Sequence, residues 1–326
     1  MRVSWRRLRS TALVSGLTVA LLGTGYLAIV ASEGSRLLVH PARSIACETP
    51  EHQFGWAYEP INYDARADPT GCVDLALRAG DEMVAFDGVR LAGWYVPSAD
   101  GAGPGAPTVV LVHGHGSNKS GMLRHGSALH EHHNLVAFDL RNAGQSSGDR
   151  TTMGFEERAD LRAVIDWLER TKGPEQIGVI GSSLGAATAI LEAADDPRVD
   201  AIVIDSMHAR LEFAVARRLL RNNQFVVPGT WAIFTAAEMR TGTNLADADP
   251  LDAVAAVGDR PLLITHGGGD SLDMPAQSSQ LIERAAREAG VPVEVHICPG
   301  ARHGKVVEVC PDEWTTWVTT FFDGAW

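Results

Sequence analysis

The sequence lacks several marks of specialised proteins: it has no repeat of about 20–50 residues, no long block of like charge and no C-x-x-C pair. A repeat architecture, a disordered chain and a cysteine-based zinc site are therefore poorly supported. Acidic residues outnumber basic ones, and the net charge of −12 argues against nucleic acid as a partner. The 45% hydrophobic and 21% charged residues are typical of a globular protein with a sizeable core.

The N-terminus contains no acidic residue before Glu33. Four arginines precede an uncharged apolar stretch at 11–31, which as a helix would be about 32 Å long, enough to cross the hydrocarbon core. Ile29 stands where an A-x-A cleavage site ending at Ala31 would have alanine. These features favour an uncleaved single-pass anchor over a cleaved secretory signal or a buried helix. The arginines are expected to stay in the cytoplasm, which places the rest of the chain outside the cell membrane.

The four cysteines are even in number, which in an exported domain permits two disulfides. Of the possible pairings, Cys47 with Cys72 and Cys298 with Cys310 close the shortest loops. Four buried free thiols are the alternative.

From Thr108 onward, apolar runs typical of buried strands alternate with helical patterns. This alternation predicts an α/β fold with a mostly parallel sheet covered on both faces. Earlier, residues 73–97 alternate in polarity around a turn at Asp87 and Gly88, which predicts antiparallel strands at the sheet edge. The later strands are expected within 108–116, 134–141, 177–180, 199–207, 260–270 and 291–300, and helices near 155–171, 184–194, 276–289 and 305–322.

Ser183 stands in "IGVIGSSLGAATAI" (177–190), between the end of an apolar strand and an alanine-rich helix. Gly181 and Gly185 flank it as G-x-S-x-G, the pattern in which a serine occupies a strained turn that exposes its hydroxyl. For this stretch alone, a glycine-rich packing turn is the alternative. Acyl transfer also needs a base and an acid, and here Asp270 and His303 follow later strands in the chain order expected for this architecture.

Together, "HGHGS", "DLRNAGQSSG", "GSSLG", "HGGGD" and "GARHG" resemble the α/β-hydrolase superfamily over about residues 73–326. The resemblance implies Ser183 as nucleophile, His303 as general base and Asp270 as its partner. It places the oxyanion hole at the backbone N–H groups of His115 and Leu184, and it implies neither a cofactor nor a metal.

The implied activity is that of a serine hydrolase that cleaves a small-molecule or lipid-like carboxylic ester, thioester or amide through an acyl-enzyme. A peptidase or acyltransferase of the same fold is one alternative. A non-catalytic binding protein on a hydrolase fold is another.

Two departures from related sequences affect these assignments. Pro275 follows Asp270 by five residues instead of four, which makes Asp273 a competing acid. Asn142 stands where glycine is common, in a loop where Arg141 is expected to be a structural ion-pair partner.

Other histidines and acids also stand near the ends of the expected strands. His113 and His115 form an H-x-H pair, but the residues that would complete a metal site do not follow them. Asp205 and His266 are possible substitutes in the triad, although packed, hydrogen-bonded roles suit them better.

The chain is expected to divide into an anchor or signal at 1–33, a connecting segment at 34–72 and the hydrolase domain at 73–326, with a small helical cap at about 207–248. The apolar side chains of the cap form either its own core or an acyl pocket. Its arginines, Arg210, Arg217, Arg218 and Arg221, either attract anionic or lipid-like substrates or pair with nearby acids.

Overall fold

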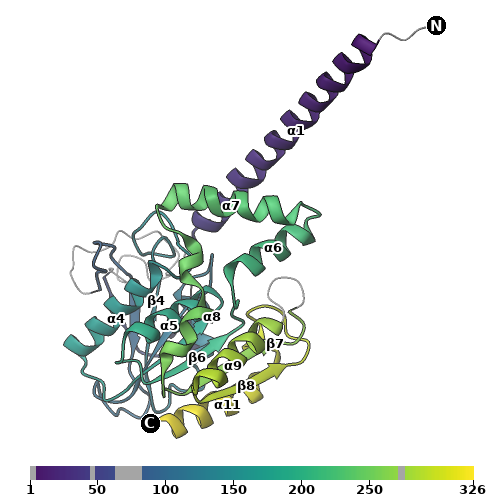
Figure 1. The fold of residues 1–326 in the computed structure, drawn as a ribbon. Helices are drawn as coiled ribbons and strands as arrows, with labels where there is room; N and C mark the ends of the chain where they lie inside the picture. The colour runs from purple at the N-terminus through teal and green to yellow at the C-terminus, as the bar shows by residue number, and fades with distance from the viewer. Residues whose placement is uncertain (1–4, 45–47, 63–82, 271–275) are drawn as a thin grey trace.

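The computed structural model describes residues 5–44, 48–62, 83–270 and 276–326. Within them, eight strands form one sheet in the order β1-β2-β4-β3-β5-β6-β7-β8 (Figure 1). The pairs from β4 through β8 are parallel, whereas β1 and β2 add antiparallel strands at one edge. The predicted mostly parallel α/β fold is therefore confirmed. The strands are β1 Glu59–Ile61, β2 Gly93–Val96, β3 Thr108–Val112, β4 Asn134–Phe138, β5 Ile177–Ser182, β6 Ala201–Asp205, β7 Leu262–Gly267 and β8 Val293–Cys298.

Helices cover both faces of the sheet because both faces are apolar. Val110 and Val112 of β3 pack in the core shared with α4, α5 and α9, while Val109 and Leu111 pack with α3 and α11 on the other face. This alternation is the two-residue period of a strand. The helices are α1 Trp5–Val39, α2 Pro50–Phe54, α3 Leu123–Gly126, α4 Glu157–Thr171, α5 Leu184–Asp195, α6 Leu211–Arg221, α7 Val226–Thr241, α8 Pro250–Ala253, α9 Gln277–Ala289, α10 Val306–Val309 and α11 Pro311–Ala325.

The N-terminal helix α1 extends well beyond the apolar stretch from which it was expected. Its side chains from 14 to 25 are exposed, but Val30 and Val39 lie in the main core. Figure 1 shows α1 protruding from the molecule, with α7 crossing its lower part and α6 beside α7. By length and composition, Val14–Val39 qualifies as a membrane span, the one such helix among the described residues.

Antiparallel edge strands were predicted within 73–97, and β2 is one of them, whereas residues 73–82 lie outside the described residues. The sheet edge also includes an earlier segment of the chain than expected. An antiparallel bridge joins Val84 to Arg90 around the predicted turn at Asp87 and Gly88, where Gly88 has a φ of 85°. The additional edge strand β1 lies in the segment expected only to connect. With three residues, it is too short to show a two-residue period in the sequence.

Arg141 is the structural ion-pair partner that the sequence predicts. Its guanidinium lies 2.7 Å from a carboxylate oxygen of the fully buried Asp160, and it also pairs with Asp87 and Glu156 at 2.9 and 3.0 Å. It thereby ties the loop after β4 to α4 and to the edge turn.

A disulfide joins Cys298, the last residue of β8, to Cys310, as predicted. Both cysteines are buried, and the loop that they close contains His303. Cys47 and Cys72 lie outside the described residues, so their pairing stays a prediction.

Replacing both Cys298 and Cys310 by serine is expected to lower the free energy of unfolding by about 3 kcal/mol, because the disulfide no longer restricts this loop in the unfolded chain. Urea unfolding of the oxidised proteins measures the loss. Any activity should fall as well, since His303 lies within the opened loop. A double variant that matches the natural protein in stability and rate would contradict this prediction.

Candidate active site

Ser183 occupies the turn between β5 and α5 with φ 54° and ψ −112°, a conformation that residues other than glycine rarely adopt. Close packing around the turn leaves no room at its flanking glycines. A Cβ on Gly181 would collide with the backbone of Gly185, and a Cβ on Gly185 would collide with the carbonyl of Val112. The backbone N–H of Ser183 donates to the carbonyl of Asp205 at 2.9 Å, which fixes the turn against β6.

Three side chains from different loops form one hydrogen-bonded chain. His303 Nε2 lies 2.9 Å from Ser183 Oγ, and His303 Nδ1 lies 2.8 Å from an oxygen of Asp270. Because a carboxylate only accepts, Nδ1 donates to Asp270, and Nε2 of the neutral ring is left to accept the serine proton. Asp270 is buried, whereas the His303 side chain is 27% exposed, so the chain runs from the interior toward solvent.

The loop that carries His303 is held from two sides. The backbone N–H of Gly304 donates to Ser206 Oγ at 3.2 Å, and a Cβ on Gly267 would collide with the carbonyl of Ala301. Together with the disulfide, these contacts fix the histidine opposite Ser183.

The two proposed substitutes in the triad have other partners. Asp205 accepts hydrogen bonds from Ser206 and Thr265 at 3.0 and 3.2 Å. His266 lies behind Asp270, with Nε2 3.6 Å from the same carboxylate oxygen that His303 contacts and Nδ1 2.8 Å from Ser279 Oγ. His266 therefore helps to surround Asp270, a role that sequence order alone does not reveal. Asp273, the competing acid, lies outside the described residues.

The two residues expected to form the oxyanion hole lie beside Ser183. Leu184 begins α5, so its N–H has no acceptor within the helix. The loop of His115 also passes close to the serine, because a Cβ on Gly114 would lie 3.2 Å from Ser183 Cβ.

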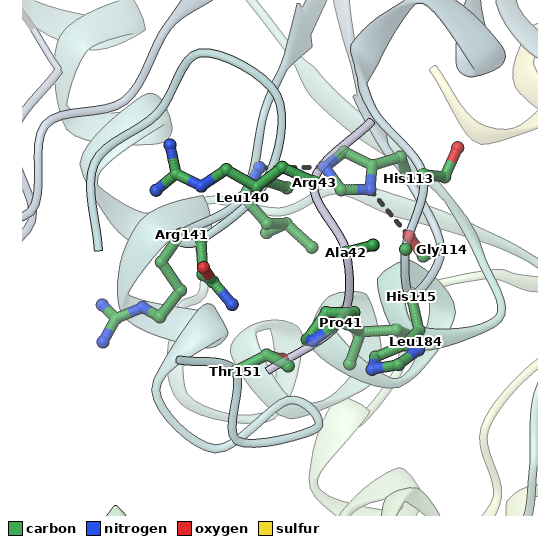
Figure 2. Close-up of a pocket in the computed structure, with 14 residues that line it drawn as sticks. Pro41, Ala42, Arg43, His113, Gly114, His115, Leu140, Arg141, Thr151 and Leu184 are labelled. Carbon is green, nitrogen blue, oxygen red and sulfur yellow. Dashed lines mark hydrogen bonds between the residues drawn. The ribbon is translucent and has the colours of Figure 1, made fainter. Parts of the chain in front are cut away.

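The histidines of the H-x-H pair are held in neutral forms by their surroundings. His113 Nδ1 donates to the carbonyl of Gly114 at 2.8 Å and Nε2 accepts from the N–H of Leu140 at 3.0 Å (Figure 2). His115 Nε2 donates to the carbonyl of Leu38 at 2.9 Å. Burial lowers the pKa of both rings. Both nitrogens of His113 are thus used in positioning its own loop.

Residues 38–44, here called the strap, run from the end of α1 across this loop. The carbonyl of Val39 accepts from Thr151 N–H at 2.8 Å, and the carbonyl of Ser44 accepts from Asn118 Nδ2 at 3.1 Å. Figure 2 shows Pro41, Ala42 and Arg43 of the strap in a small pocket that His115 and Leu184 also line. The strap therefore supports the proposed oxyanion loop from the side away from the sheet.

His208, three residues after β6, is buried with no hydrogen bond to its ring among the described residues. Among the described residues, neither ring nitrogen has a hydrogen-bond partner, and the side chain is 1% exposed. Burial, with a smaller contribution from nearby His303, lowers the pKa of His208 to about 4.

This shift predicts that the protein loses stability in mild acid. Below about pH 6.5 the unfolded chain protonates His208 while the folded protein does so only near pH 4. The free energy of unfolding should fall over this window by about 3 kcal/mol through His208 alone, and the buried His113 and His115 contribute in the same direction. In urea unfolding between pH 7.5 and 4.5, His208→Gln should show a shallower pH slope than the natural protein. Equal slopes would contradict the assignment.

Comparison with known proteins agrees with this architecture. A model described as the alpha/beta hydrolase fold matches residues 107–255. The chain is 28% identical over 307 residues to the uncharacterized protein Rv2307c of Mycobacterium tuberculosis, covering 92% of this chain and 90% of that one. It is 27% identical over 228 residues to the uncharacterized protein YfhR of Escherichia coli K12, covering 68% and 72%.

Among solved structures, an esterase of Pyrococcus furiosus, PF2001, superposes with a TM-score of 0.68 and 24% identity, covering 88% of this chain and 98% of that one. The chain therefore has the α/β-hydrolase fold. The family model, which covers less than half of the chain, and the solved structures agree on this fold.

Proposed function

We propose that the protein is a serine hydrolase that cleaves a carboxylic ester, thioester or amide through an acyl-enzyme, with an ester as the preferred substrate. The hydrogen-bonded chain from Ser183 through His303 to Asp270 carries this proposal. Ser279 also contacts a histidine that faces Asp270, but the His266 ring lies 3.6 Å from the carboxylate and both Ser279 and His266 are buried, so this serine is not placed to meet a substrate.

In the proposed mechanism, Ser183 Oγ attacks the substrate carbonyl carbon while its proton passes to His303 Nε2. The oxyanion is stabilised by the N–H groups of His115 and Leu184, each worth about 3 kcal/mol in such sites. His303 then protonates the leaving group, which departs and leaves the acyl group on Ser183. Water then attacks the acyl carbonyl while His303 Nε2 takes its proton, and the acyl–Oγ bond breaks as the ring returns that proton to Ser183, which releases the acid product. Asp270 orients the ring and stabilises its charged form.

The remainder of the chain places this site relative to a membrane. We propose that α1 anchors the protein, that the hydrolase domain lies outside the cell membrane and that α6 and α7 form a cap. The exposed apolar residues 14–25 of α1 support the anchor. Protease added to intact cells, with any outer envelope opened, should digest the domain. If the domain is digested only after the inner membrane is broken, the domain lies on the cytoplasmic side and the proposed orientation is wrong.

A fluorophosphonate probe tests the serine mechanism directly. The folded protein should be labelled at Ser183, as peptide mass spectrometry would show, whereas the heat-unfolded protein should not react. Esters of graded acyl length, compared with a peptide amide, then identify the preferred class. A folded protein that resists the probe and turns over none of these substrates would disprove the proposal.

A further inference from the structure

Exposed apolar side chains gather on the two proposed cap helices. Outside α1, the part of the chain that the structure describes has ten exposed large hydrophobic residues, and six of them lie within residues 211–241. In α7, Val227 and Trp231 are 81% and 70% exposed and one helical turn apart, so they share one face of the helix. Ile233 and Ala237, in contrast, are buried. The six are Phe213, Leu220, Phe225, Val227, Trp231 and Met239.

Helix α7 is joined directly to the lower half of α1. The ring of Tyr26 meets that of Phe225 edge to face at 5.7 Å between centroids, and its hydroxyl accepts from Phe225 N–H at 3.4 Å. Further along α1, a Cβ on Gly34 would collide with Ile233, and Arg240 Nε donates to Ser35 Oγ at 2.9 Å. These contacts fix α7 to the helix that is proposed to enter the membrane.

The point at which α1 leaves the protein sets the level of the bilayer. Toward the N-terminus from Tyr26, the described side chains are exposed, and the uncharged stretch from residue 11 to Tyr26 is about 24 Å long as a helix. A stretch a few ångströms shorter than the hydrocarbon core is accommodated by local thinning of the bilayer, and tyrosine is typical of the boundary. Tyr26 therefore marks the membrane surface on the side of the domain. Phe225, in contact with Tyr26, lies at the same level.

We propose that Phe225, Val227 and Trp231 form a membrane-contacting face that inserts into the headgroup region of the bilayer beside the anchor. The proposal rests on the anchoring role proposed for α1. An aromatic and aliphatic face with arginines nearby suits an anionic lipid surface, because apolar burial and attraction to headgroups add. On α6, Arg218 is exposed, and Arg210, just before the helix, pairs with Asp249 and Asp252. The hydrolase site would then receive acyl substrates that reside in the membrane.

Tryptophan quenching tests the contact without relying on activity. The full-length protein is reconstituted in vesicles of phosphatidylcholine with about one third phosphatidylglycerol, an anionic surface of the kind that attracts arginine. Two vesicle preparations are compared: in one, the phospholipids carry bromine near the headgroup end of the acyl chain, and in the other they carry no bromine. The fluorescence difference between the natural protein and Trp231→Phe isolates Trp231. We expect bromine to quench this difference signal. An unquenched Trp231 in a correctly inserted protein would overturn the proposal.

Hydrolysis separates this proposal from the activity itself. In a Val227→Ser, Trp231→Ser variant, KM for a long-chain ester embedded in the vesicles should rise at least about tenfold, the change expected when the equivalent of one buried apolar side chain is lost. Turnover of a short, water-soluble ester should be unchanged. Phe86→Ser removes an exposed aromatic side chain that lies outside residues 211–241 and should change neither. Equal losses on both esters would overturn the membrane role, whereas inactivity of the natural protein on every ester would disprove only the hydrolase.

Discussion

Replacing Ser183 by alanine is expected to lower kcat by about 10⁶, the loss seen when the nucleophile of a well-studied triad is removed. The alanine has no oxygen to attack the substrate carbonyl or to share a proton with His303 Nε2. The free energy of unfolding should change little, because the substitution removes a single described hydrogen bond, the one between Ser183 Oγ and His303. Steady-state kinetics on the best ester, with circular dichroism to verify folding, measures both quantities.

The adjacent serine provides a matched control. Ser182 is the last residue of β5 and is 7% exposed, so Ser182→Ala makes the same chemical change one position earlier in the turn. It should retain most of the activity and react with the fluorophosphonate probe. If Ser183→Ala keeps more than about a tenth of the natural rate, Ser183 is not the nucleophile.

Replacing Asp270 by asparagine should lower kcat by about 10⁴, as the equivalent change does in serine proteases. The amide can donate to His303 Nδ1, which favours the wrong tautomer and leaves no negative charge to stabilise the protonated ring. His266 on the other side of the carboxylate keeps the site filled, so the variant should remain folded.

Asp273→Asn is the matched control for the acid, because the sequence alone does not decide whether Asp270 or Asp273 is the partner of His303. It should have a mild effect. A severe loss in Asp273→Asn together with a mild one in Asp270→Asn would move the acid to Asp273. His303→Ala should resemble Ser183→Ala, because the proton of the nucleophile then has no acceptor.

The sequence predicts those parts of the molecule that depend on local pattern. Buried parallel strands such as β3 and β5 appear as continuous apolar runs, and the turn at Ser183 appears through glycines that its tight packing requires. The motifs and their chain order predict Ser183, Asp270 and His303 as site residues, and in the structure the His303 ring lies within hydrogen-bond distance of the other two.

Contacts between distant segments leave no such pattern. His115 donates to a backbone carbonyl of Leu38, and any residue type offers a carbonyl, so the strap has no signature in the sequence. The length of α1 was underestimated for a related reason. The helix continues past its apolar stretch because α7 packs against it. Gly34 leaves room for the Ile233 side chain of α7, a contact that the sequence alone does not reveal. The burial of His208 likewise depends on the surrounding tertiary structure.

The strap also determines what would survive if a protease released the domain from the membrane. A cut after Ala31 would remove Tyr26 and Val30 but leave Ser35, which holds Arg240, and the carbonyl of Leu38. The shed protein would keep the support of its oxyanion loop. A cut a single helical turn beyond Val39 would instead separate Leu38 from His115. If the proposed mechanism holds, shedding at the first position leaves the released domain active, and shedding at the second inactivates it.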